Sequence, residues 1–238
     1  MGENREVAMP SMFITGANRG LGLEWVCQYA REGWRVYASC RHPAEADALK
    51  ALAEKNSSIS IHRLDVTKAD DVRAIIWEME GKSIDVLVCN AGVYLEKGRP
   101  EFGCLRYSEW DTTFEVNMKG AVRVIEALVG NVERSDKKLV VSISSHMGSI
   151  ADIQSPGSYY YRSSKAALNA VMQALCVELK TQGIGVLILH PGGVKTRMGP
   201  RGGISPEESV SGMRRIIERF TIADTGRFFR YDGEELPW

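Results

Sequence analysis

The 238-residue sequence has no excess of either charge and no long apolar run. Its 30 Lys and Arg residues balance its 30 Asp and Glu residues, so the formal net charge is zero. A nucleic-acid-binding domain usually carries a strongly basic surface, which this balance argues against. No apolar stretch approaches the ~18 residues of a membrane-spanning helix, and residues 1–10 have no apolar signal-peptide core. We therefore expect no nucleic acid or membrane partner, and a cytoplasmic location.

Cysteine and histidine are few and scattered. The sequence has no CxxC motif, and no two of its 4 histidines stand at metal-ligand spacing. An odd number of widely spaced cysteines is typical of buried free thiols in a reducing compartment. We therefore predict no disulfide framework and no metal site. The cysteines are Cys27, Cys40, Cys89, Cys104 and Cys176.

Short apolar segments alternate along the chain with amphipathic ones. Strands are predicted at 12–14, 35–40, 59–64, 84–89, 139–144, 186–190 and 227–231. Helices are predicted at 21–31, 44–55, 69–80, 108–131, 158–182 and 206–220. This alternation predicts parallel strand pairing through right-handed crossovers. We predict a single-domain α/β fold of Rossmann type over residues 11–238, after a flexible N-terminus (1–10). The fold would be a doubly wound parallel sheet of about seven strands with helices on both faces.

A glycine-rich turn separates the first predicted strand from the first predicted helix. Its glycines are Gly16, Gly20 and Gly22, in the spacing GxxxGxG. Gly16 suits a tight turn, Gly20 lets the backbone approach a pyrophosphate, and Gly22 lets the helix lie close to the sheet. The N–H groups and partial positive charge of the helix N-terminus attract an anion. The turn predicts a dinucleotide site, with a ligand-free glycine turn as the alternative.

No acidic residue follows the second predicted strand. NAD sites usually place an Asp or Glu there to bind the ribose 2′-hydroxyl. Here the strand ends in Ser39-Cys40-Arg41. Arg41 and Arg19 can instead bind a 2′-phosphate, because a guanidinium presents a planar fork of donors to an anion. This favours NADP(H), with NAD(H) possible. The alternative is that both arginines are simply solvated.

Tyr161 and Lys165 stand four residues apart in a predicted helix and therefore on one face. A neighbouring ammonium and the positive ring of an oxidised nicotinamide both favour the phenolate. Lowering the tyrosine pKa from ~10 to ~7 requires ~4 kcal/mol, of which a close lysine can supply much. The pair predicts a general acid for carbonyl reduction and a base for the reverse reaction. The alternative is an ordinary surface helix.

Serines end the fifth predicted strand, where ligands bind in open α/β sheets. A hydroxyl from Ser144 or Ser145 can polarise a carbonyl oxygen beside Tyr161. A serine hydrolase is a poor match, because the sequence has no GxSxG turn.

With these motifs in this order, the sequence resembles the short-chain dehydrogenase/reductase family from about residue 11 to the C-terminus. The further matching positions are Asp65-Val66, Asn90-Ala91-Gly92 (preceded by Cys89 where the family has Asn), Asn117 and His190-Pro191-Gly192. Within the family, the segments around Ser145 and Tyr161 resemble sniffer-type carbonyl reductases and C-signal proteins.

The resemblance implies a catalytic tetrad. Tyr161 is its acid/base, and Lys165 holds the nicotinamide ribose and lowers the tyrosine pKa. Ser145, with Ser144 as the runner-up, orients the carbonyl, and Asn117 helps to hold a water on a proton relay from Lys165. The implied cofactor-binding residues are Gly16, Asn18, Arg19, Gly20, Leu21, Gly22, Arg41, Asp65, Val66, Asn90, Ala91, Gly92, Tyr161, Lys165, Pro191, Gly192, Val194 and Thr196.

The substrate site is less defined by the sequence. The expected pocket residues are His146, Met147, Ile153, Tyr159, Gly193 and Met198, which suggests a fairly apolar carbonyl compound. Gly193 and Arg197 replace a Trp and an Asp that are frequent in this subgroup, so a relative's substrate does not transfer. We expect an NADPH-dependent carbonyl reductase acting on a small carbonyl or alcohol. The alternative is an NAD(P)-binding signalling protein of C-signal type with little turnover. The resemblance also implies a homodimer or homotetramer, paired through the helices at 108–131 and 158–182.

Overall fold

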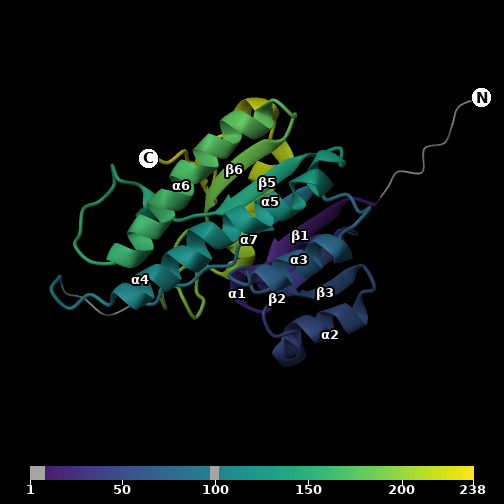
Figure 1. Ribbon diagram of the computed structural model, residues 1–238, viewed down its shortest axis with the longest axis horizontal. Coiled ribbons are helices and arrows are strands. Elements are labelled where there is room, and N and C mark those ends of the chain that lie inside the picture. The colour runs from purple at the N-terminus through teal and green to yellow at the C-terminus, as the bar shows by residue number, and fades with distance from the viewer. Residues whose placement is uncertain (1–8, 97–101) are drawn as a thin grey trace, which may run out of the picture.

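Seven parallel strands form one sheet in the computed structural model, which describes residues 9–96 and 102–238. Their spatial order is β3-β2-β1-β4-β5-β6-β7 (Figure 1). The strands are β1 (Ser11–Thr15), β2 (Arg35–Cys40), β3 (Ile59–Arg63), β4 (Val86–Cys89), β5 (Leu139–Ile143), β6 (Gly185–His190) and β7 (Phe228–Arg230). All seven predicted strands are present. The expected flexible segment 1–10 lies outside the described residues, apart from Met9 and Pro10.

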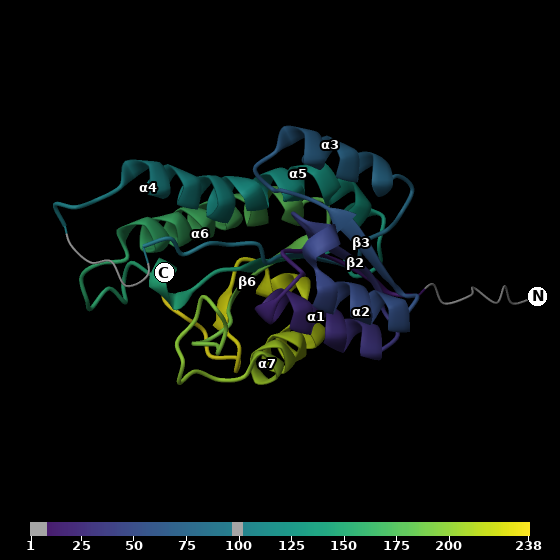
Figure 2. The ribbon, with the colours of Figure 1, turned by 90° about the horizontal axis from the view of Figure 1, so that it is seen from below.

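Helices cover both faces of the sheet (Figure 2). One face carries α1 (Gly20–Arg31), α2 (Asp47–Lys55) and α7 (Pro206–Arg219). The other carries α3 (Ala69–Glu78), α5 (Gly120–Glu133) and α6 (Tyr159–Lys180), with α4 (Tyr107–Phe114) extending α5 beyond the sheet. Short 3₁₀ turns occupy Pro43–Glu45, His146–Gly148 and Ile222–Asp224.

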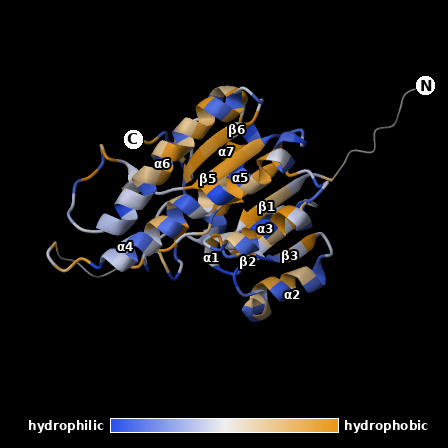
Figure 3. Cartoon of the chain, in the orientation of Figure 1, coloured by the Kyte–Doolittle hydropathy of each residue, from blue (hydrophilic) through white to orange (hydrophobic). Residues whose placement is uncertain are grey.

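The central strands β1, β4, β5 and β6 are mostly hydrophobic because both of their faces are buried (Figure 3). Successive side chains point to opposite faces of a strand. In β1, Met12 and Ile14 therefore enter the core beneath α1 and α7, whereas Phe13 enters the core beneath α5 and α6. This two-sided core confirms the predicted doubly wound α/β fold.

The strand order reverses between β1 and β4. In open α/β sheets, ligands bind in the crevice at the carboxyl ends of the strands beside such a reversal. The glycine turn follows β1 at Gly16, and Asn90 follows β4. Both motifs therefore lie at the edge of the sheet where the topology places a ligand.

The long helix predicted at 108–131 is present as one helical run from Tyr107 to Glu133, but it contains a turn that the sequence did not predict. A five-residue π-helical turn, Glu115–Lys119, joins α4 to α5. Such turns occur mostly as single insertions in α-helices and often at functional sites. Buried Asn117 is at the centre of this turn. No proline or glycine lies inside the turn to announce it in the sequence.

All five cysteines, each within the described residues, are free. Cys40, Cys89 and Cys176 are buried, as predicted, but Cys27 is half-buried and Cys104 is exposed in the loop before α4. Across 9–96 and 102–238, no helix has the length and hydropathy to cross a membrane. In the same residues, no three His, Cys, Asp or Glu side chains gather as metal ligands would.

Candidate active site

The glycine turn is closed by backbone contacts that leave no room for a side chain. Gly16 and Gly20 have φ values of +70° and +55°, in the left-handed region that favours glycine. A Cβ at Gly22 would lie 2.1 Å from the carbonyl oxygen of Gly16. Helix α1 then begins without a side-chain cap from Arg19. Its first N–H groups thus face the turn as an anion site requires.

A second turn, after β4, is tied to the first by hydrogen bonds. The Thr15 hydroxyl accepts from the N–H groups of Asn90 (3.0 Å) and Ala91 (2.9 Å). In return, the Asn90 side-chain amide donates to the Thr15 carbonyl oxygen at 2.9 Å. Thr15 therefore organises the site, although sequence reasoning assigned it no role. Its position as the last residue of β1 was the available signal.

The two arginines expected at a 2′-phosphate are both exposed, beside the turns after β1 and β2. Within the described residues, neither Arg19 nor Arg41 forms an ion pair. Asp65 lies close enough to Arg41 to feel its charge. Burial opposes ionisation of Asp65, but hydrogen bonds from Thr67 and the charges of Arg41 and Lys68 outweigh it and lower its pKa. Asp65 is thus an ionised acceptor near the guanidinium group of Arg41.

Tyr161 and Lys165 lie on one face of α6 beside the end of β5. The Nζ of Lys165 lies 5.8 Å from the centre of the Tyr161 ring and donates to the Ile143 carbonyl oxygen at 2.8 Å. The Ser145 side chain lies close enough to Tyr161 to lower the tyrosine pKa. The Ser144 hydroxyl instead donates to Oδ1 of Asn169 at 2.6 Å. The geometry therefore brings Ser145, rather than the runner-up Ser144, to Tyr161.

Asn117 reaches the same region from the π turn. Its Oδ1 accepts from the Val93 N–H at 2.8 Å, and its Nδ2 donates to the Val93 carbonyl oxygen (2.9 Å) and to Ser164 (3.0 Å). A Cβ at Gly92 would lie 3.4 Å from Asn117 Oδ1 and 3.9 Å from Lys165 Nζ. All four tetrad positions therefore converge. Both polar atoms of the Asn117 amide hydrogen-bond to the Val93 backbone after β4. The role of Asn117 in holding a water stays a prediction.

Burial dominates the electrostatics of the Tyr161–Lys165 pair. It raises the pKa of Tyr161 to about 12, against the lowering effect of the Ser145 side chain. It also lowers the pKa of Lys165 to about 8. The lowered tyrosine pKa expected from the sequence is therefore not found in the protein alone, because desolvation of the phenolate outweighs the lowering effect of Ser145. At neutral pH Tyr161 is protonated, which is the state that a general acid needs.

Comparison with known proteins agrees with this arrangement. A model of the short chain dehydrogenase family matches residues 10–202. The chain belongs to the short-chain dehydrogenase/reductase family. C-signal of Myxococcus xanthus is 38% identical over 157 residues, covering 65% of this chain and 93% of that protein. Carbonyl reductase Sniffer of D. melanogaster is 30% identical, covers 97% of this chain and 100% of its own, and has a TM-score of 0.89. The structure of NADPH-bound carbonyl reductase from chicken fatty liver is 28% identical to this chain and also has a TM-score of 0.89. The match covers 97% of this chain and 99% of that one.

The six residues expected at the substrate pocket of this family member do not gather in one place. Met147, Ile153 and Tyr159 line an apolar cavity of about 420 Å³ together with Trp110. His146, Gly193 and Met198 are not among the described residues that line it, and neither are Tyr161 and Ser145. The lining residues of α6 lie on a different face of the helix from Tyr161 and Lys165. The cavity therefore opens beside a different face of α6 from the one that carries Tyr161 and Lys165.

His146 instead contacts His190, which precedes the Pro191-Gly192 turn. Nδ1 of His146 lies 3.2 Å from Nε2 of His190. Burial, followed by the nearby His146, lowers the pKa of His190 to about 3. Burial also lowers the pKa of His146. The two imidazoles are thus a neutral pair between Ser145 and the turn after β6.

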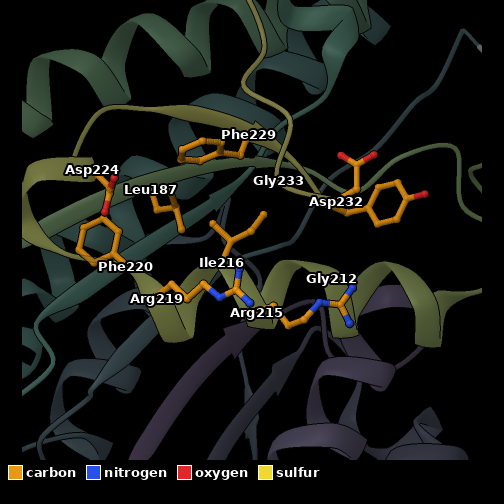
Figure 4. A pocket seen from close by; sticks show the side chains of 11 residues that line it. Leu187, Gly212, Arg215, Ile216, Arg219, Phe220, Asp224, Phe229, Asp232 and Gly233 are labelled. Atoms are coloured by element: carbon orange, nitrogen blue, oxygen red, sulfur yellow. The ribbon is translucent and has the colours of Figure 1, made fainter.

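A further cavity of about 260 Å³ lies between α7 and the C-terminal segment (Figure 4). Arg215 and Arg219 border it from α7, and Phe229 and Asp232 border it from the opposite side. None of the predicted cofactor or substrate residues lines it. The cavity is therefore separate from the tetrad.

Sequence reasoning missed two residues that contact Tyr161. The Tyr94 ring stacks on that of Tyr161, with ring centres 4.6 Å apart. Oε1 of Glu96 accepts a hydrogen bond from the Tyr161 backbone N–H at 2.6 Å. The one available signal was their position just after Asn90-Ala91-Gly92. Their contacts depend on how β4 and α6 meet in the fold.

Proposed function

We propose that the chain is an NADPH-dependent carbonyl reductase in which Tyr161 donates the proton to the carbonyl oxygen. The observation that carries this proposal is the convergence of Asn117, Ser145, Tyr161 and Lys165 at the carboxyl edge of the sheet. The glycine turn after β1 lies at that same edge. The likeness to carbonyl reductases, one of them NADPH-bound, supports the same reaction class.

The residues present fit a phosphorylated dinucleotide. No side chain fits at Gly22, whose Cβ would meet the Gly16 carbonyl oxygen, so the backbone of the turn is open to a pyrophosphate there. Arg19 and Arg41 supply positive charge for a 2′-phosphate. Asp65 and Val66 would flank the adenine. The nicotinamide half would lie by Asn90, Ala91, Gly92, Pro191, Gly192, Val194 and Thr196. When bound, NADPH supplies the hydride that reduces the carbonyl carbon.

The protein's own groups supply the polarisation and the proton. The Ser145 hydroxyl donates a hydrogen bond to the substrate oxygen, and Tyr161 gives that oxygen its proton as negative charge develops. Tyr161 is partly exposed and so accessible to a substrate. Lys165, held by Ile143, orients the nicotinamide ribose and restores the tyrosine proton through a relay that includes Asn117. A positioned general acid contributes roughly 10²- to 10⁴-fold to the rate.

A titration tests this proposal. Purified protein is titrated with NADPH and with NADH, and cofactor binding is followed by fluorescence. A panel of apolar aldehydes and ketones is then assayed with the cofactor that binds, beside a panel of small charged oxo acids. We expect tighter NADPH binding and turnover of the apolar compounds. A preference for the charged acids would refute the apolar substrate expected from the sequence, and NADH preference would refute the role of the arginines.

A signalling protein of C-signal type is the second candidate, because C-signal matches 65% of this chain at 38% identity. In that case the tetrad would bind a dinucleotide with little turnover. Cofactor binding without oxidation of the cofactor on either panel would favour this second candidate.

For the reductase we propose a cytoplasmic location, because NADPH is available there.

We also infer a homodimer or homotetramer that is paired through the outer faces of α4 and α6. Tyr107 on α4 is 70% exposed and Val177 on α6 is 75% exposed. Val177 shares its helix face with Tyr159, Ser163 and Ala166, which border the apolar cavity. Light scattering should show a dimer or tetramer, and Val177→Asp should shift it towards the monomer. A monomeric wild type would refute this inference.

A further inference from the structure

The chain that leaves the turn after β4 runs across the N-terminal end of the catalytic helix. Val93 is fixed at the start of this segment, since the Asn117 side chain bonds both its N–H (2.8 Å) and its carbonyl oxygen (2.9 Å). Residues 93–96 thus leave the proposed nicotinamide turn in a defined direction. They end at Glu96, beside the first turn of α6.

Glu96 caps α6 from outside the helix. The residue is only 5% exposed, and its Oε1 accepts from the Tyr161 N–H at 2.6 Å. Ser158, at the N-cap position of α6, makes no capping hydrogen bond of its own. A carboxylate at a helix N-terminus bonds an otherwise unpaired N–H and interacts favourably with the helix dipole. The N–H that Glu96 bonds is that of the catalytic tyrosine itself.

Tyr94 contacts the side chain of Tyr161, whereas Glu96 bonds its backbone. Its ring stacks on the Tyr161 ring with centres 4.6 Å apart and an interplanar angle of 30°. Its hydroxyl hydrogen-bonds to the Ser158 hydroxyl. Ser158 has a φ of +57°, which is costly for a residue other than glycine. Backbone strain of this kind persists only where surrounding contacts enforce it, and it clusters at functional sites.

We propose that Tyr94 and Glu96 are positioning residues that hold the Tyr161 phenol at its working distance from the nicotinamide turn. Glu96 fixes the backbone of Tyr161, and Tyr94 fixes the plane of its ring. Both belong to the segment that begins at Asn90-Ala91-Gly92, so they connect the cofactor turn to the proton donor. This inference rests on the proposed reductase function.

Loss of this positioning should reduce the rate of proton transfer rather than cofactor binding. A misplacement of about 1 Å at a reacting group can cost roughly 10²-fold in rate. Glu96→Ala removes the acceptor of the Tyr161 N–H, whereas Glu96→Gln keeps an acceptor oxygen and removes only the charge. Tyr94→Leu removes the stacked ring, whereas Tyr94→Phe keeps it and removes only the hydroxyl.

The test measures kcat, KM, NADPH affinity and thermal stability for these four variants, with the best carbonyl substrate from the panel. Glu96→Ala should lower kcat roughly 10- to 100-fold and leave NADPH affinity within about 3-fold, and Glu96→Gln should restore most of the rate. Asp85→Ala is the matched control, because Asp85 also accepts from a backbone N–H, that of Ser11 at 2.8 Å, at the opposite edge of the sheet. It should lower thermal stability and leave kcat unchanged.

The pH profile separates positioning from simple structural support. Burial is the main cause of the raised Tyr161 pKa, and the stacked Tyr94 ring, which Tyr94→Phe keeps and Tyr94→Leu removes, covers one side of the Tyr161 ring. Tyr94→Leu should therefore lower kcat and move the alkaline limb of the reduction profile to lower pH, whereas Tyr94→Phe should move it little. If Glu96→Ala does not fold, the comparison of Tyr94→Leu with Tyr94→Phe still tests the positioning proposal. Unchanged kcat and an unchanged profile in folded Glu96→Ala and Tyr94→Leu would overturn the proposal.

A failure of the proposed function would look different. If the wild type turns over no carbonyl, or if Tyr161→Phe keeps full turnover, then the reductase proposal fails and the positioning proposal fails with it. If turnover requires Tyr161 and is indifferent to Tyr94 and Glu96, then only the positioning proposal fails.

Discussion

The Nζ of Lys165 donates to the carbonyl oxygen of Ile143 at 2.8 Å, deep at the end of β5. This single neutral acceptor does not replace the water that a buried ammonium loses. The residue is 4% exposed, and burial lowers its pKa to about 8 from an ordinary 10.5. The lysine is therefore held at the site at a cost in stability.

Lys165→Met should stabilise the protein while removing activity. Between pH 8 and 10.5 the unfolded chain binds a proton at this lysine that the folded protein has released. The free energy of unfolding therefore rises with pH across this window. The full difference corresponds to about 3 kcal/mol, which Lys165→Met should gain at pH 7. Urea unfolding at pH 7 and 9.5 measures it, with exposed Lys180→Met as the control. A variant no more stable than the wild type would contradict the buried charge.

His190 should make the protein sensitive to acid. Its pKa of about 3 lies below the ordinary 6.5, so in this window the unfolded chain binds a proton that the folded protein does not. Stability therefore falls as the pH drops below 6.5. From pH 6.5 to 5 this residue alone should cost about 2 kcal/mol. Urea unfolding should show the loss in the wild type and in His42→Gln, whose histidine is exposed, and a smaller loss in His190→Gln. Equal losses in all three would count against a buried neutral His190.

Gly22→Ala should disrupt the cofactor turn. The added Cβ would lie 2.1 Å from the Gly16 carbonyl oxygen, so α1 and the turn must move apart. We expect NADPH affinity to fall at least ~10-fold, with a loss of about 1–3 kcal/mol in stability from overpacking. In Gly130→Ala the Cβ has room on α5, where the nearest atom is 3.9 Å away. That control should gain about 0.5–1 kcal/mol and bind NADPH normally. Normal NADPH affinity in Gly22→Ala would show that the turn does not hold the pyrophosphate.

Arg19→Ala and Arg41→Ala should weaken NADPH binding selectively. A charge-assisted hydrogen bond contributes about 1.5–3 kcal/mol, so each variant should lose roughly 10-fold or more in NADPH affinity. NADH has no 2′-phosphate, and its affinity should change little. Arg134→Ala, an exposed arginine at the end of α5, is the control. Fluorescence titration at fixed ionic strength measures the NADPH and NADH dissociation constants of all three variants and the wild type. An equal loss of affinity for both cofactors would mean that the arginines do not recognise the 2′-phosphate.

The sequence was sufficient for the fold because its apolar strands, amphipathic helices and glycine turns all agree. It was also sufficient to find Tyr161, Lys165, Ser145 and Asn117 as a set. It was insufficient for the π turn around Asn117, because no backbone-breaking residue marks it. Thr15, Tyr94 and Glu96 acquire their roles only from neighbours distant in the chain. The direction of the Tyr161 pKa depends on burial, which a helical spacing of four residues does not reveal.

The lining of the substrate pocket could not be predicted from the sequence either. Met147, Ile153 and Tyr159 are near Ser145 or Tyr161 in the chain, and proximity in sequence suggested a place beside the reacting centre. In the fold they border a cavity on another face of α6. A helix turns ~100° per residue, so two positions in the chain are enough to move a side chain from one face to another.

The most direct test of the central claim compares two hydroxyl deletions on adjacent residues. Tyr161→Phe and Tyr160→Phe each remove one phenolic oxygen, and the Tyr160 hydroxyl accepts a hydrogen bond from the backbone N–H of Arg106. Carbonyl-dependent oxidation of NADPH is measured for both. The account predicts that Tyr161→Phe binds NADPH normally and loses at least ~10²-fold in kcat, while Tyr160→Phe keeps its rate. Turnover by Tyr161→Phe close to that of the wild type would contradict the assignment of the proton donor.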